Sequence, residues 1–192
     1  MIRKLSLLML LFCSACIQLG GETQPTRFYL LEPVSEEQNQ SLTEIQLEIS
    51  PIGFHSYLDR PQIDTRNSDN LIQIADYDRW AEPLADNFIR TLQENLRQHT
   101  GIRISSAPWT NNIRPDYSLK LSINRFDGTL GQQTDVDIRW SLVALANNEE
   151  IARQHFKDQR PIGTSYQEFV KGLNKALTQL SQKINAAILA VQ

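Results

Sequence analysis

Cysteine is nearly absent from this sequence. The 192 residues include two cysteines, Cys13 and Cys16, and both lie close to the N-terminus. The chain beyond Cys16 has no thiol, which excludes disulfides, thiolate metal ligands and a cysteine nucleophile from that part. A chain of this length is expected to form a single domain, and it can bury enough apolar surface to fold without disulfides.

Motifs that carry chemistry are lacking too. The three histidines, His55, His99 and His155, lie far apart, and no two have the spacing of metal ligands. The sequence holds no Gly-x-Ser-x-Gly turn, no His-Glu-x-x-His motif, no phosphate-binding loop and no dinucleotide-binding motif. We therefore expect no catalytic residue, no cofactor and no metal, and hence a protein that is not an enzyme.

Positive charge is scarce. Lys and Arg number 19 against 22 Asp and Glu, a net charge of −3. Loss of an N-terminal leader with Arg3 and Lys4 would leave 17 basic and 22 acidic residues, a net charge of −5. Without a basic stripe to neutralise phosphates, the sequence predicts no nucleic-acid partner.

The N-terminus is typical of a bacterial lipoprotein precursor. Arg3 and Lys4 precede an apolar run over residues 5–12, which is too short for a permanent transmembrane helix. The following Cys13-Ser14-Ala15-Cys16 resembles a lipobox, apart from Cys13 where Leu is usual. The alternative is an ordinary secretory leader with an incidental cysteine.

We therefore predict three segments: a lipoprotein signal peptide over residues 1–15, lipidated Cys16 with a tether to residue 26, and a folded domain over residues 27–192. Several acyl chains on Cys16 would hold the protein firmly on a membrane. Ile17 follows the lipidated position; because Asp there favours inner-membrane retention in families we know, Ile17 indicates the outer membrane of a Gram-negative bacterium. The domain would then face the periplasm.

An amphipathic helix is expected from residue 80 to residue 100. Asp78 is the predicted N-cap, Pro83 fits the first turn, and Gly101 can end the helix in the left-handed conformation. The apolar residues that would form its buried face are Ala81, Leu84, Ala85, Phe88, Ile89, Leu92 and Leu96.

Strands with period-two alternation flank this helix. They are expected at residues 28–31, 45–49, 102–104, 117–124, 136–142 and 150–158, the last three as an antiparallel meander with a turn at Asn147-Asn148. Pro61 marks an edge strand or a turn. Ser165 and Glu168 form a capping box for a second amphipathic helix. The fold class that follows is α+β: one domain with a mixed or mainly antiparallel sheet and two amphipathic helices on one face.

One family combines these features. Residues 58–62 read Leu-Asp-Arg-Pro-Gln, Arg66 follows, and residues 77–84 read Tyr-Asp-Arg-Trp-Ala-Glu-Pro-Leu. This combination resembles the ABC-type transport auxiliary lipoproteins, the family of paraquat-inducible protein C (PqiC). The resemblance implies a non-enzymatic adaptor for MCE-domain proteins (PqiB-like), which carry lipids between the two membranes. It also implies a homo-oligomer, with a ring as one such assembly.

The residues most open to a functional role are Asp59, Arg60, Arg66 and Trp80. Their structural interpretation is a turn fixed by Asp59, an arginine paired across the sheet, and a tryptophan packed at the helix start. Their functional interpretation is contact with a partner or a second subunit, where Trp and Arg tend to carry binding energy. Two other functions remain open: a module that binds a lipid or another hydrophobic ligand, and a general envelope-assembly lipoprotein.

Overall fold

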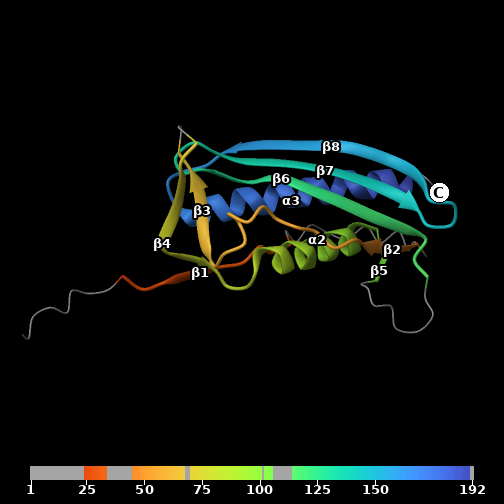
Figure 1. The fold of residues 1–192 in the computed structure, drawn as a ribbon, viewed down its shortest axis with the longest axis horizontal. Helices are drawn as coiled ribbons and strands as arrows, with labels where there is room; N and C mark the ends of the chain where they lie inside the picture. Colours follow the sequence, from red (N-terminus) through yellow and green to blue (C-terminus); the bar gives the residue numbers. More distant parts are fainter. Residues whose placement is uncertain (1–23, 34–44, 68–69, 101, 106–113, 191–192) are drawn as a thin grey trace, which may run out of the picture.

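The computed structural model describes residues 24–33, 45–67, 70–100, 102–105 and 114–190, and Figure 1 shows their arrangement. Long strands run the length of the molecule, with a small sheet at one end and short strands at the other. Within the described residues, no helix is both long enough and apolar enough to cross a bilayer.

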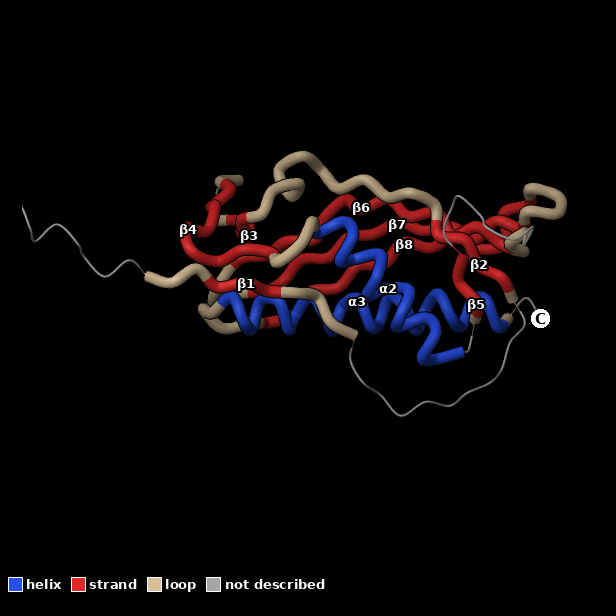
Figure 2. The backbone as a smooth tube through the Cα atoms, turned by 90° about the horizontal axis from the view of Figure 1, so that it is seen from below, coloured by secondary structure: helices blue, strands red, loops and turns tan. Residues whose placement is uncertain are grey.

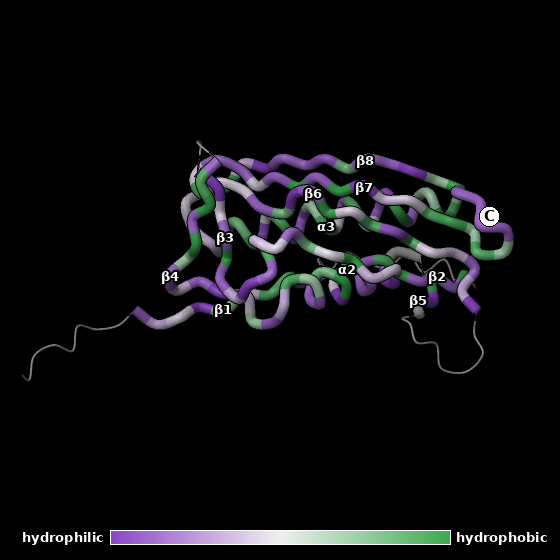
Figure 3. The backbone as a smooth tube through the Cα atoms, viewed as in Figure 1, coloured by the Kyte–Doolittle hydropathy of each residue, from purple (hydrophilic) through white to green (hydrophobic). Residues whose placement is uncertain are grey.

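The larger sheet has five strands. β6 (Tyr117–Thr129), β7 (Gln133–Ala144) and β8 (Glu149–Pro161) form an antiparallel meander, as the alternation predicted. β2 (Gln46–Ile49) pairs in parallel with β6 and with β5 (Arg103–Ser105), which gives the order β5-β2-β6-β7-β8. Figure 3 shows that the edge strand β8 is hydrophilic along most of its length, a composition that discourages pairing with other chains.

The hairpins of the meander end in residues that accept positive φ. Gly131 joins β6 to β7 with φ 75°, where glycine has no Cβ to strain. Asn148 joins β7 to β8 with φ 58°, and this confirms the turn predicted at Asn147-Asn148.

In the described part of the chain, two helices cover one side of the long strands (Figure 2). α2 (Leu84–Thr100) and α3 (Tyr166–Leu189) pack against each other, and α3 lies against β7 and β8. Ser165 caps α3 as predicted, because its hydroxyl accepts a 3.2 Å hydrogen bond from the Glu168 backbone N–H. Gly172 allows the close approach of α3, since a Cβ there would lie 2.8 Å from Cγ2 of Thr134.

The apolar faces of the helices and of the meander form one core. Phe88 of α2 is fully buried, with its ring edge-to-face against Phe54 and Phe126 at centroid distances of 5.5 and 5.3 Å. Leu84, Leu92 and Leu96 are buried on the same face of α2, as their spacing predicted. The prediction was wrong for Ala81, which is exposed and precedes the helix, while Ala85 and Ile89 at the edge of this face are half-buried. Other large buried side chains are Leu31, Leu47, Ile63, Leu119, Ile138, Trp140 and Phe169.

The first helix begins later than predicted. Asp78 and Trp80 belong to strand β4 (Ile72–Trp80), so Asp78 does not cap the helix. Its carboxylate instead accepts hydrogen bonds from Arg27 and from the Tyr29 hydroxyl, which hold it in the sheet. The predicted stop at Gly101 lies outside the described residues.

The strands form two sheets rather than one. β1 (Arg27–Tyr29) and β3 (Gln62–Arg66) flank β4 in a three-stranded sheet, with β1 parallel and β3 antiparallel to β4. We call it the small sheet. β3 is an edge strand that starts directly after Pro61, as the proline predicted. The class α+β, with one domain and mixed pairing, is confirmed.

Candidate functional site

The two sequence segments that carry the family resemblance meet at one place on the surface. The backbone N–H of Trp80 donates to the Pro61 carbonyl at 2.7 Å, which joins the end of β4 to the start of β3. Between them lies a hollow of about 280 Å³, here called the junction hollow. Its lining consists of Asp59, Arg60, Pro61, Trp80, Ala81, Glu82, Pro83 and Leu84.

Arg60 forms an ion pair beneath this hollow. Its Nε lies 3.3 Å from Oδ2 of Asp64, whose side chain is 1% exposed. Neither carboxylate oxygen of Asp64 accepts a well-oriented hydrogen bond from the described residues. Burial raises the pKa of Asp64, and the positive charge of Arg60 opposes that rise. Arg60 therefore compensates a buried charge.

Trp80 is a wall of the hollow rather than an exposed anchor. Its side chain is 5% exposed, and Trp80 pairs with Tyr29 across the β1–β4 ladder. The next residue, Ala81, donates its backbone N–H to the Tyr29 carbonyl at 2.9 Å. Any contact that a partner makes here would therefore reach Asp59, Arg60 and the hollow's rim more readily than the indole.

Arg66 lies elsewhere. It leaves the far end of β3 and donates from Nε to Oδ2 of Asp127 on β6 at 2.6 Å. The Tyr57 hydroxyl donates to the same oxygen at 2.9 Å, and the Arg66 guanidinium lies over the Tyr57 ring, 5.2 Å from its centroid. The structure thus brings together Asp59, Arg60 and Trp80 and separates Arg66 from them.

The small sheet and its flanks hold most of the exposed apolar side chains in the described ranges. Of the seven large hydrophobic residues exposed in the described ranges, five lie there: Phe28, Leu30, Leu71, Ile74 and Tyr77. Phe28 is 65% exposed, and it pairs with Arg79 in β4, two residues beyond Tyr77. Sequence reasoning missed this surface, because it took Asp78 as the cap of a helix and predicted no strand that continues to Trp80.

An ion pair fixes β1 to the sheet and was also missed. Arg27 donates from Nε and from Nη2 to the two oxygens of Asp78, each at 2.8 Å. The Tyr29 hydroxyl donates to Oδ1 at 2.8 Å, and burial, with this hydrogen bond, raises the pKa of Tyr29. The sequence does contain two side-chain donors two residues apart, Arg27 and Tyr29, that could bind Asp78. Recognising them requires knowing that β1 pairs in parallel with β4 in this register.

The described ranges contain no cluster of three or more His, Cys, Asp or Glu side chains that could hold a metal. Cys16, the predicted lipidation site, lies outside those ranges. The chain matches the model of a family described as ABC-type transport auxiliary lipoprotein component over residues 29–185.

The chain belongs to this family. It is PqiC-like, as its sequence indicated. Family membership supports a membrane-anchored lipoprotein of the Gram-negative periplasm with an auxiliary role in transport. No curated protein was found to match the sequence.

Solved structures share the fold. A crystal structure described as an uncharacterized protein is 21% identical with a TM-score of 0.70, covering 86% of this chain and 99% of that one. Protein XCC0632 from Xanthomonas campestris, of family DUF330, is 18% identical with a TM-score of 0.65, covering 83% and 92%. Hypothetical protein CT253 from Chlamydia trachomatis is 7% identical with a TM-score of 0.51, covering 77% and 99%. At these identities the likeness concerns the fold alone.

Proposed function

We propose that this protein is a non-enzymatic adaptor of an MCE-type intermembrane lipid transport system and thereby supports envelope integrity. Lipidated Cys16 anchors it to the outer membrane, and the domain over residues 27–192 faces the periplasm. Its partner is a PqiB-like MCE-domain protein, which binds through the small sheet and the rim of the junction hollow.

The observation that carries this proposal is the exposed apolar surface of the small sheet. Exposed apolar groups that gather in one region, beside charged residues, are typical of a protein interface. Phe28 and Tyr77 supply aromatic area, and Arg79, which pairs with Phe28 across the β1–β4 ladder, supplies a charged side chain beside it. Aromatic and arginine side chains are the residues that most often dominate binding energy.

The position of β1 adds support. β1 begins at Arg27, eleven residues after Cys16. A tether of this length reaches at most about 35–40 Å, at roughly 3.3–3.6 Å per residue. The small sheet is therefore the part of the domain connected most directly to the lipid anchor. A partner held there would be held close to the membrane.

The adaptor also self-associates in this proposal. A repeated docking surface around one axis suits a tubular partner, and closed rings are a common way to build it. The contacts would come from strand residues and the Pro61 segment, because the apolar stripes of α2 and α3 are already buried in the core. Sedimentation velocity of the intact lipoprotein in detergent tests this: a discrete oligomer is expected, and a monomer at all concentrations would contradict it.

The adaptor role is tested by isolating the intact lipoprotein from membranes and identifying the proteins and lipids that accompany it. We expect an MCE-domain protein at a fixed ratio. Recovery of a stoichiometric lipid with no protein partner would instead favour the lipid-binding alternative and overturn the adaptor proposal.

A further inference from the structure

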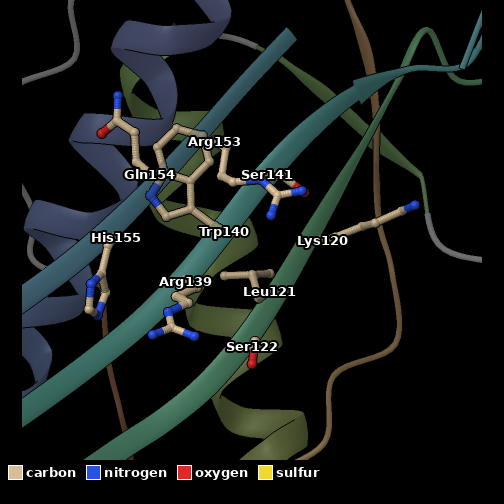
Figure 4. Close-up of a pocket in the computed structure, with 9 residues that line it drawn as sticks. All are labelled: Lys120, Leu121, Ser122, Arg139, Trp140, Ser141, Arg153, Gln154 and His155. Atoms are coloured by element: carbon tan, nitrogen blue, oxygen red, sulfur yellow. The ribbon is translucent and has the colours of Figure 1, made fainter. Parts of the chain in front are cut away.

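The face of the meander opposite the helices carries a second hollow, of about 520 Å³, here called the sheet-face hollow (Figure 4). It lies across β6, β7 and β8. Because side chains alternate along a strand, residues two apart on these strands share this outer face. The lining residues are Lys120, Leu121, Ser122, Arg139, Trp140, Ser141, Arg153, Gln154 and His155.

Strand register arranges the outward side chains in two rows. In the first row Lys120 pairs with Ser141, and Ser141 pairs with Arg153. In the second row Ser122 pairs with Arg139, which in turn pairs with His155. Directly opposed residues have Cβ atoms about 4.5–5.5 Å apart, so each arginine or lysine has a serine hydroxyl as its neighbour.

Some of these cations are already paired and some are not. Arg153 donates to both oxygens of Glu150, at 2.8 and 2.6 Å, and His155 Nε2 lies 2.8 Å from Oδ1 of Asp137. Arg139 and Lys120 make no hydrogen bond or ion pair with any residue in the described ranges. Lys120 does, however, lie in the field of Glu150: the hydrogen bonds from Arg153, and more weakly the charge of Lys120, lower the pKa of that carboxyl group. Among the described residues, Arg139 is thus the cation of the hollow without a carboxylate partner, and the charge of Lys120 is only partly offset by Glu150.

This charge is unusual for the chain, whose net charge is −3. Carboxylates border the hollow on two sides, with Glu150 at one end and Asp137 at the other. A long polyanion would run into these carboxylates, whereas a single compact anion fits between the two rows without reaching them. A guanidinium beside hydroxyl donors matches the oxygens of a phosphate group.

We propose that the sheet-face hollow binds the phosphate group of an anionic phospholipid head group. Arg139 and Lys120 supply the charge, and Ser122 and Ser141 donate hydrogen bonds to the remaining phosphate oxygens. The phosphate is assigned to a phospholipid because the chain belongs to a family of membrane-anchored lipoproteins, and phospholipid is the most concentrated phosphate at a membrane surface. The inference does not require the transport partner, so it can fail while the adaptor role stands.

Native mass spectrometry of the intact lipoprotein in neutral detergent tests this, with phosphatidylglycerol titrated in. The double variant Lys120→Gln/Arg139→Gln removes two positive charges that make no direct ion pair, both from exposed positions. The matched control, Lys175→Gln/Lys183→Gln, removes two exposed lysines of α3. We expect the apparent Kd for phosphatidylglycerol to rise about tenfold or more in the double variant and to change less than about twofold in the control.

Two further probes test whether the phosphate group is what the hollow recognises. Diacylglycerol, which lacks the phosphate, should bind no better to the wild type than to the double variant. Inorganic phosphate at millimolar concentration should compete with phosphatidylglycerol. Equal phosphatidylglycerol binding by wild type and double variant would overturn the proposal. So would binding of diacylglycerol as tight as that of phosphatidylglycerol, or binding of inorganic phosphate without any of the lipid.

Discussion

Arg66 and Asp127 join the two sheets: Nε of Arg66, at the end of β3, lies 2.6 Å from Oδ2 of Asp127 on β6. The Asp127 side chain is 1% exposed and also accepts hydrogen bonds from Tyr57 and Arg125. The hydrogen bond to Asp127 raises the pKa of Arg66, which stays charged. This contact holds the small sheet, with its exposed apolar residues, in a fixed position on the meander.

Replacing Arg66 with methionine should destabilise the fold. Removing one partner of a buried pair commonly costs about 3–5 kcal/mol, and we expect the low end because Arg125 still contacts Asp127. Urea unfolding measures the change. Arg97→Met is the control, since Arg97 lies 3.8 Å from Glu94 on the surface and such pairs contribute about 0–1 kcal/mol. Equal losses in the free energy of unfolding for the two substitutions would contradict a stabilising role for the Arg66–Asp127 ion pair.

Asp64→Asn should stabilise the protein at neutral pH. Burial raises the pKa of Asp64 in the folded state, so folding favours its protonated form. The stability that Asp64 contributes below the unfolded pKa is therefore lost as pH rises through the folded pKa. We expect a higher melting temperature than wild type at about pH 7 and a difference that shrinks toward about pH 4. The exposed Asp59→Asn is the control, and no difference at neutral pH would refute the burial argument.

Phe88→Ala should cost about 3–5 kcal/mol, through lost apolar contact and the cavity left between Phe54 and Phe126. The free energy of unfolding in urea measures it. Leu189→Ala, at a position 41% exposed, should cost well under half as much. If the urea midpoint of Phe88→Ala equals that of the wild type, Phe88 does not lie on the buried face of α2.

Cys16→Ala should abolish lipidation and leave uncleaved precursor, because the thioether to the lipid needs the Cys16 sulfur. Growth with a labelled fatty acid measures incorporation. Cys13→Ala is the matched control and should be labelled as the wild type is. Label on Cys16→Ala equal to that on the wild type would rule out the anchor.

The elements that sequence patterns predicted well are the ones whose signals are local. The meander followed from strict alternation, the α3 start from Ser165 and Glu168, and the buried leucines and Phe88 of α2 from their three- and four-residue steps. Each pattern depends on geometry within one element. The predicted start of α2 was wrong. Asp78 has the residue type of an N-cap, but its carboxylate is bound by Arg27, which is distant in the sequence.

The candidate site was predictable only in part. Asp59, Arg60 and Trp80 were singled out by family resemblance, and the structure gathers them around one hollow. The interactions of these residues could not be predicted from the sequence. The buried carboxylate that pairs with Arg60 belongs to Asp64, and the Trp80 side chain is covered by the fold. The two-sheet arrangement and the paired rows of the sheet-face hollow depend on register between strands, which no single segment encodes.

The measurement that tests the adaptor account most directly is recovery of the MCE-domain partner with variants of the small sheet. The intact lipoprotein is isolated from membranes as wild type, as Phe28→Ser/Tyr77→Ser, and as the control Leu145→Ser/Leu189→Ser, which alters exposed residues elsewhere. We predict that wild type and control retain the partner, while the small-sheet variant loses about nine-tenths of it, as expected when two central aromatic contacts are removed. Equal recovery with all three proteins, or no MCE-domain protein with the wild type, would contradict the account.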